Sequence, residues 1–297
     1  MGKDVAASYS AASAVFEQAD AALGMKLSSL CFEGPEEELK LTEITQPAIL
    51  TTSIAILRAV EPLLGKPDFV AGHSLGEYSA LVAAGCLRFE DAVTVVRERG
   101  RAMQEATPPG EGAMAAIMGC ELETIEAACA EASERGICSP ANLNSPGQVV
   151  IAGHRSAVEY AAMLLKERGA RRTTMLAVSA PFHCELMKPA ADRMGPVLAS
   201  TVFNDLATPL VTNVDAAVIT SGDEARSSLL RQITQPVRWG DSMALLVKQG
   251  VSRFVEIGPG KVLSGLAKQI CRDLKVDCEI ISVDSVESIE QISGALA

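Results

Sequence analysis

The sequence alternates short apolar runs with segments whose apolar residues recur at helical spacing. The runs that are typical of strands occupy residues 68–72, 208–214, 253–257 and 279–283. Helical patterns lie between the runs, at residues 46–64, 227–233 and 241–248. Since parallel neighbours need a crossover, which is usually a helix, this alternation predicts an α/β fold with a largely parallel sheet.

Residues 112–178 follow a different order, which is strand, helix, strand, strand, helix, strand. That order is typical of a ferredoxin-like unit. Turn-forming residues flank it at 107–112 and 179–181. The chain length of 297 residues suits two domains at about 150 residues each. We therefore predict a discontinuous large domain, residues 1–109 and 179–297, with a small domain, residues 110–178, inserted into it.

The charge balance limits the partners of the chain. Its 26 Lys and Arg face 37 Asp and Glu, a net charge of −11, which argues against nucleic acid or an anionic membrane surface as the main partner. No apolar stretch approaches the roughly 18 residues of a membrane span, and the first residues lack the apolar core of a secretory signal. We expect a cytoplasmic protein.

The cysteines and histidines show no metal-binding pattern. Eight cysteines contain no C-x-x-C pair, and three histidines form no H-E-x-x-H motif. We expect no metal site.

Gly72-His73-Ser74-Leu75-Gly76 fits the pattern G-x-S-x-G. An apolar strand precedes this segment and a helical pattern follows it, so a sharp strand-to-helix turn would expose the Ser74 hydroxyl at the edge of the sheet. The backbone N–H of Leu75, at the helix N-terminus, would face a developing oxyanion. The alternative is a glycine-rich turn with an incidental serine.

A serine nucleophile needs a base, and three histidines are available. His73 adjoins Ser74, but adjacent residues leave a tight turn in different directions. His154 follows a Gly-His turn within the predicted small domain. His183 lies where the small domain rejoins the large one, and a domain junction favours a cleft. His183 is the best candidate base, with a structural histidine as the alternative. No aspartate has a context that selects it as a third member, so a backbone carbonyl or a side-chain amide is the alternative orienting group.

One arginine falls on the apolar face of its predicted helix, where a charged side chain is unexpected. In the helical pattern over residues 91–106, Arg99 falls at the centre of the apolar stripe, whereas Arg97 and Arg101 fall on the opposite face. A buried guanidinium needs an anionic partner and suits a carboxylate. That partner is either an internal Asp or Glu or the carboxylate of a substrate.

Together these residues resemble the malonyl-CoA:acyl carrier protein transacylase family of fatty-acid and polyketide synthesis. Motifs in the order of that family span nearly the whole chain. They are Thr45-Gln46-Pro47-Ala48, Gly72-His73-Ser74-Leu75-Gly76-Glu77, Arg99-Gly100-Arg101-Ala102-Met103-Gln104, Asn142-Leu143-Asn144-Ser145-Pro146-Gly147-Gln148, Pro181-Phe182-His183-Cys184, Gln232-Ile233-Thr234-Gln235-Pro236-Val237-Arg238-Trp239 and Glu256-Ile257-Gly258-Pro259-Gly260.

The resemblance implies a hydrolase-like core with a ferredoxin-like insert. It implies transfer of malonyl from malonyl-CoA to the phosphopantetheine thiol of acyl carrier protein, through a malonyl-Ser74 intermediate. His183 is then the base, Arg99 binds the malonyl carboxylate, and the main-chain carbonyl of Gln232 orients His183. We expect a monomer that needs no cofactor; malonyl-CoA and phosphopantetheinylated acyl carrier protein are its two substrates.

The resemblance also implies that Gln46, Asn142 and His73 line or support the pocket. For Gln46, Asn142 and Gln232 the alternative is an ordinary amide in a turn.

The sequence departs from the family at its start. The family opens with a strand that leads into a Gly-Gln-Gly-Ser-Gln loop, which is absent here, so the first strand is expected to be missing. The glutamine of that loop supplies a second oxyanion donor, and losing one such donor costs about 2.7–4 kcal/mol of transition-state stabilisation. Two other functions therefore stay open: a serine thioesterase or esterase, and a carrier-protein-binding subunit that is inactive without its first strand.

Overall fold

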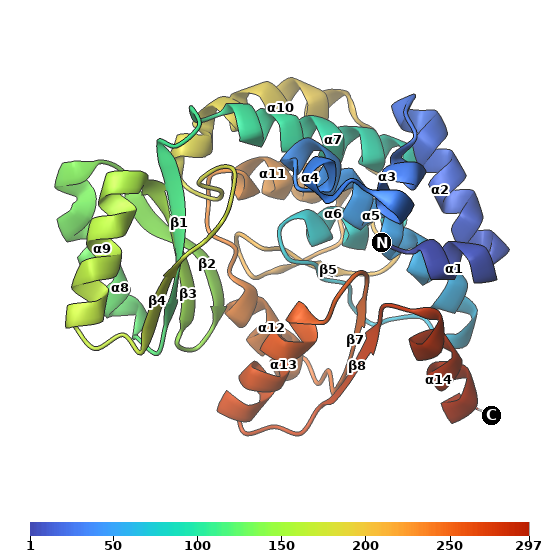
Figure 1. Cartoon of the computed structure of the whole chain (residues 1–297). Helices are drawn as coiled ribbons and strands as arrows, with labels where there is room; N and C mark the ends of the chain where they lie inside the picture. Colours follow the sequence, from blue (N-terminus) through green and yellow to red (C-terminus); the bar gives the residue numbers. More distant parts are fainter. Residues whose placement is uncertain (297) are drawn as a thin grey trace.

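The structure, a computed structural model, describes residues 1–296 (Figure 1). Helices form the whole N-terminal part, and α5 is the central one, since it contacts α2, α6 and α7. Residues on all sides of α5 are buried, as expected for a helix surrounded by protein. The elements of this part are α1 (Lys3–Ser8), α2 (Ser10–Leu23), α3 (Leu27–Glu33), α4 (Glu36–Leu39), α5 (Thr42–Val60) and the 3-10 helix η1 (Glu61–Leu63).

Two further helices, α6 (Leu75–Ala83) and α7 (Phe89–Glu105), pack beside α5 and beside each other. Val70, just ahead of α6, forms a parallel bridge with Leu210. The chain then turns sharply between Gly72 and Ser74 and enters α6. The predicted strand-to-helix turn is therefore present, although the strand is reduced to one bridge.

Residues 112–175 form a four-stranded sheet covered by two helices. In chain order the elements are β1 (Gly112–Met118), α8 (Leu122–Ala132), η2 (Ser133–Arg135), β2 (Cys138–Ser145), β3 (Gln148–His154), α9 (Arg155–Glu167) and β4 (Arg172–Met175). The strands lie in the order β2-β3-β1-β4, and every neighbouring pair is antiparallel. A cluster that includes Ile117, Ile125, Ile151 and Leu165 packs these helices on the sheet. Figure 1 shows this unit at one end of the molecule.

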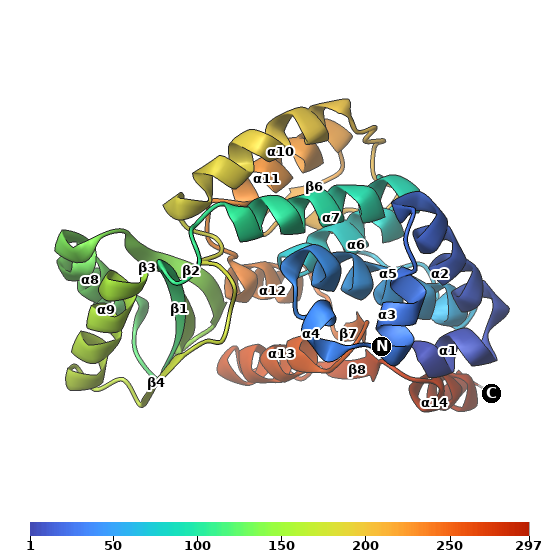
Figure 2. The same ribbon diagram turned by 45° about the horizontal axis from the view of Figure 1, so that its top comes forward.

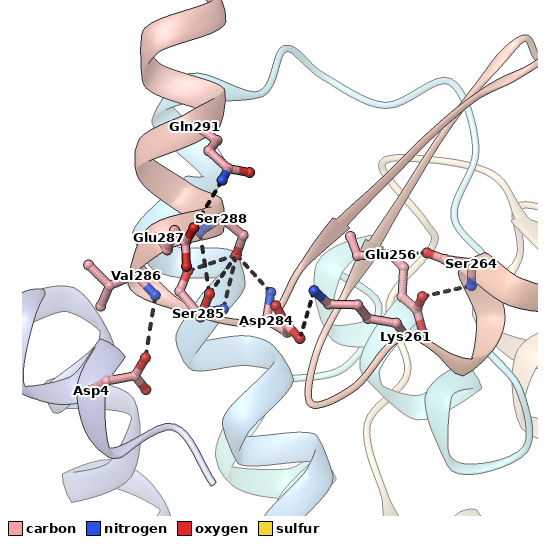
Figure 3. A network of polar contacts seen from close by, with 11 residues as sticks. Asp4, Glu256, Lys261, Ser264, Asp284, Ser285, Val286, Glu287, Ser288 and Gln291 are labelled. Carbon is pink, nitrogen blue, oxygen red and sulfur yellow. Dashed lines mark hydrogen bonds and ion pairs between the residues drawn. The ribbon is translucent and has the colours of Figure 1, made fainter.

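The chain then returns to the larger body through short strands and helices. These are η3 (Glu185–Met187), α10 (Lys188–Ser200), β5 (Leu210–Val211), β6 (Val218–Ile219), α11 (Gly222–Gln232), α12 (Trp239–Lys248), β7 (Arg253–Ile257), α13 (Val262–Asp273), β8 (Glu279–Val283) and α14 (Val286–Leu296). Polar contacts hold the C-terminal elements α13 and α14 in place (Figure 3). Glu256 accepts hydrogen bonds from the first N–H groups of α13, and Asp4 accepts one from Val286 N.

The expectation of a largely parallel sheet is wrong. Within residues 1–296 only β7–β8 and two isolated bridges pair in parallel, whereas the four-stranded sheet and β5–β6 are antiparallel. One reason is that β2 and β3 form a hairpin, so the longest sheet is not built from helical crossovers between neighbours. The other is that residues 208–214 contribute only the two-residue strand β5.

A missing first strand is not evident in the structure. α1 begins at Lys3 and packs on α2, α5 and α14, and Val5 is fully buried (Figure 2). Among the described residues, no helix is both long and apolar enough to cross a membrane.

Candidate active site

The turn between Gly72 and Ser74 presents the serine. Ser74 has φ 53° and ψ −105°, a strained conformation that is typical of functional sites. A Cβ on Gly72 would lie 1.9 Å from the carbonyl oxygen of Gly76, so only glycine fits where the chain passes so close to itself. Ser74 occupies the N-cap position of α6, yet its hydroxyl makes no capping hydrogen bond. The hydroxyl is therefore available for other contacts.

His183 contacts that hydroxyl directly. Its Nε2 lies 2.7 Å from Ser74 Oγ, and its Nδ1 lies 2.7 Å from the main-chain carbonyl oxygen of Gln232. Because a carbonyl only accepts, Nδ1 carries the proton and Nε2 is free to accept one from serine. His183 is only 3% exposed, and burial together with the nearby Arg99 charge lowers the pKa of His183 to about 3. The imidazole is therefore neutral near pH 7, as a general base must be.

Arg99 lies inside the protein beside the serine. It is 1% exposed, and burial lowers its pKa. Nη1 donates to Gln46 Oε1 at 2.7 Å, while Nη2 donates to Gln232 Oε1 at 2.8 Å and to Ser74 Oγ at 3.1 Å. Nε is buried without a partner in the part of the chain that the structure describes. All three acceptors are neutral, so the internal carboxylate considered from the sequence is not in contact with the guanidinium.

The remaining predicted residues lie around this centre at different distances. Leu75 is the first residue of α6, where backbone N–H groups have no partner within the helix. His73 Nε2 lies 2.9 Å from Asn144 Oδ1, and no hydrogen bond between described residues joins the His73 ring to the Ser74 hydroxyl. Asn142 is buried in β2 and bridges Val237, and no hydrogen bond between described residues joins its side chain to the serine or the histidine.

Sequence reasoning missed two polar residues beneath the serine. Asn213 accepts a hydrogen bond from Ser74 N at 2.7 Å and donates to the carbonyl of Gly72 at 2.7 Å, so it holds both sides of the turn. Glu77 is 0% exposed and accepts from Gln232 Nε2 at 2.7 Å and from Asn213 N at 3.2 Å. Burial raises the pKa of Glu77 to about 7, against the effect of these hydrogen bonds. An asparagine within an otherwise apolar run was the available signal for Asn213.

Among residues 1–296 no group of three or more His, Cys, Asp or Glu side chains is placed to hold a metal ion. Ser74, His183 and Arg99 are the reactive and charged side chains that the structure brings together. A serine at a strand-to-helix turn of an α/β fold, joined to a neutral histidine, defines a class of proteins that form acyl-serine intermediates.

Comparison with known proteins narrows this class to acyl transferases. The family model described as "Acyl transferase domain" matches residues 1–287. A malonyl CoA-acyl carrier protein transacylase of Bacillus subtilis (strain 168) is 50% identical over 291 residues, covering 98% of this chain and 90% of the relative. The protein of the same name from Escherichia coli (strain K12) is 52% identical over 268 residues, covering 90% of this chain and 87% of the relative.

The solved structure of the malonyl CoA-acyl carrier protein transacylase from Coxiella burnetii has a TM-score of 0.95, with 41% identity. The match covers 100% of this chain and 93% of that one. The fold is therefore the α/β fold of these enzymes, and the chain belongs to the malonyl-CoA:acyl carrier protein transacylase family.

Proposed function

We propose that this protein transfers the malonyl group of malonyl-CoA to the phosphopantetheine thiol of acyl carrier protein, with malonyl-Ser74 as the intermediate. Relatives at about half identity over nearly the whole chain carry this activity in their names. A solved relative from type II polyketide synthesis is described in complex with its acyl-carrier protein. The observation that carries the proposal is the position of Ser74 Oγ, 2.7 Å from His183 Nε2 and 3.1 Å from Arg99 Nη2.

In the first half-reaction Ser74 is acylated. His183 Nε2 takes the serine proton as Oγ attacks the thioester carbonyl, and the N–H of Leu75 donates to the resulting oxyanion. The carbon–sulfur bond then breaks, and His183 returns the proton to the leaving thiolate of CoA. Throughout, the Gln232 carbonyl accepts a hydrogen bond from His183 Nδ1–H and stabilises the transient imidazolium.

In the second half-reaction the carrier-protein thiol repeats these steps in reverse. His183 accepts the thiol proton, the sulfur attacks malonyl-Ser74, and the serine leaves with the proton. Because one histidine serves both halves, the two substrates use the same site in turn.

Arg99 explains the choice of malonyl. Its guanidinium binds the free carboxylate of the acyl group, and Gln46 and Gln232 hold it in place. An acetyl group has no carboxylate and would leave the buried charge without an anion, which disfavours it. Asn142 and His73 form more distant walls of the same pocket.

The domain division also remains a proposal. We place a hydrolase-like catalytic domain at residues 1–109 and 179–297 and a ferredoxin-like domain at 110–178. One apolar cluster draws its buried residues only from 113–170, whereas another joins residues on both sides of that segment, which supports the division. We further propose a cytoplasmic monomer whose partners are malonyl-CoA and acyl carrier protein, not nucleic acid or membrane.

Intact-protein mass spectrometry after exposure to malonyl-CoA tests this function. A malonyl adduct should form on the protein, and none should form on Ser74→Ala. Ser79→Ala is the matched control, because Ser79 lies in the same helix with a buried hydroxyl that makes no hydrogen bond to the described residues. Absence of the adduct from the folded, unaltered protein would contradict transfer and favour the carrier-binding alternative. Steady release of malonate without carrier protein would favour the thioesterase.

A further inference from the structure

Glu77 is a fully buried carboxylate that touches none of the reacting groups, although it lies one turn after the nucleophile. We propose that Glu77 is a positioning residue, whose carboxylate sets the orientation of the Gln232 side-chain amide and thereby the position of Arg99. The inference rests on the proposed transfer reaction and adds a residue that controls its selectivity.

The local sequence predicts a different role for Glu77. Ser74 and Glu77 have the spacing of a capping box, in which the glutamate reaches back to the N–H of the N-cap residue. Neither half of that box forms here. Ser74 N donates to Asn213 Oδ1 instead, and Ser74 Oγ faces His183. Glu77 is thus released from the helix terminus and turned into the interior.

Inside, the carboxylate decides which way the amide of Gln232 points. Gln232 Nε2 donates to Glu77 Oε2 at 2.7 Å and to Ser74 O at 3.0 Å, which places Oε1 at 2.8 Å from Arg99 Nη2. Ionised Glu77, the form that the hydrogen bonds from Gln232 and Asn213 favour, only accepts, and a guanidinium only donates. With the amide reversed, oxygen would face oxygen at Glu77 and N–H would face N–H at Arg99. The contacts at Glu77 and at Arg99 therefore favour the same orientation of the Gln232 amide.

This arrangement also keeps Arg99 free for a substrate. The charge of Glu77 acts on the buried guanidinium, but a neutral amide, that of Gln232, is hydrogen-bonded to both and separates the two. A direct ion pair would occupy donors that the malonyl carboxylate needs. The intervening Gln232 lets Glu77 act on the buried charge while Arg99 Nη2 keeps its contact with Ser74 Oγ.

Two conservative substitutions separate position from charge. Glu77→Asp keeps the charge but withdraws the carboxylate by one methylene, out of reach of Gln232 Nε2. Glu77→Gln removes the charge but keeps an oxygen for Gln232 Nε2 and Asn213 N, because its own N–H₂ can donate toward Ser228 Oγ, which lies 3.4 Å from Glu77 Oε1. If position matters, Glu77→Asp is the damaging change and Glu77→Gln rescues it.

The readout is the ratio of kcat/KM for malonyl-CoA to that for acetyl-CoA, normalised to folded protein. Glu77→Asp should lower this ratio by about 10-fold to 100-fold, the scale of a misplaced binding group. Glu77→Gln should stay within about threefold of the original ratio. In a Gln232→Met background, which keeps the main-chain carbonyl, Glu77→Asp should add little, because it acts through the missing amide.

Glu256→Asp is the matched control. Glu256 caps α13, and no hydrogen bond between described residues joins it to the site residues, so its variant should alter stability without altering the ratio. The proposal is overturned if Glu77→Gln is the more damaging change, or if both Glu77 variants only lower the melting temperature. These outcomes differ from failure of the proposed function, in which the unaltered protein itself forms no malonyl adduct.

Discussion

Replacing Arg99 with methionine is the most direct test of how the site selects its acyl group. Methionine keeps the unbranched apolar stem that packs in the interior but removes the guanidinium. Three hydrogen bonds disappear with it, to Gln46, Gln232 and Ser74. The protein should still fold, because the neutral amides keep other neighbours such as Glu77 and Met103.

The magnitude follows from the burial of Arg99. At 1% exposure, the pair it forms with a malonyl carboxylate is almost fully desolvated. Breaking such a pair by removing one partner costs about 3–5 kcal/mol, because the other charge is left buried and unpaired. At about 1.4 kcal/mol per factor of ten, the preference for malonyl over acetyl should fall by roughly 100-fold to 5,000-fold.

The assay is single-turnover acylation of Ser74, quenched and read by intact mass, with malonyl-CoA and acetyl-CoA in parallel. Arg101→Met is the matched control, because Arg101 lies on the solvent side of the same helix, 56% exposed and paired with Glu105. Its ratio should match that of the unaltered protein. An unchanged malonyl preference in Arg99→Met would refute the assignment of the carboxylate to Arg99.

Four further predictions follow, two on the base and one each on the serine turn and the carrier protein. Because burial and Arg99 lower the pKa of His183 to about 3, acylation of the Glu77→Gln variant, in which the carboxyl of pKa about 7 no longer titrates, should change less than about twofold between pH 8 and pH 5.5; a midpoint near the ordinary histidine value of about 6.5 would contradict a neutral base. Between about pH 6.5 and pH 3 the unfolded chain protonates His183, whereas the folded protein does not, because its pKa is about 3. As the pH falls through this range, His183 alone should therefore lower the free energy of unfolding by about 1.4 kcal/mol per pH unit. Asn213→Ala should cost about 1–3 kcal/mol for each buried group it leaves unpaired, Ser74 N and the Gly72 carbonyl, as measured by denaturant unfolding; a loss below 1 kcal/mol would mean that water replaces the amide. The adjacent exposed Arg171 and Arg172 offer a basic docking patch, so reversing both to Glu should slow transfer to the carrier protein but not acylation by malonyl-CoA; equal loss of both steps would exclude these residues as that patch.

The strands show which features of the fold could be predicted from the sequence and which could not. The elements over residues 112–175 follow one another in the predicted order, because each has a clear period and clear turns. The run at 208–214 has equally apolar residues, yet only Leu210 and Val211 form a strand. Strand length and direction depend on which neighbours supply hydrogen bonds, and those neighbours lie far away in the chain.

Features that depend on neighbours close along the chain could be predicted from the sequence. The close turn at Ser74 follows from Gly72, where a Cβ would meet the Gly76 carbonyl, and the inward position of Arg99 follows from the period of its helix. Backbone sterics and helical geometry act within a few residues, although the distant Asn213 then holds both sides of the turn.

The hydrogen-bond partners of these residues became clear only from the tertiary structure. It brought His183 within 2.7 Å of Ser74 across 109 positions and placed the Gln232 carbonyl behind the histidine. It also turned Glu77 away from the helix cap that its spacing predicts and toward Gln232. A buried polar group must find a hydrogen-bond partner wherever the fold provides one, and that choice is made by packing between segments that no local pattern relates.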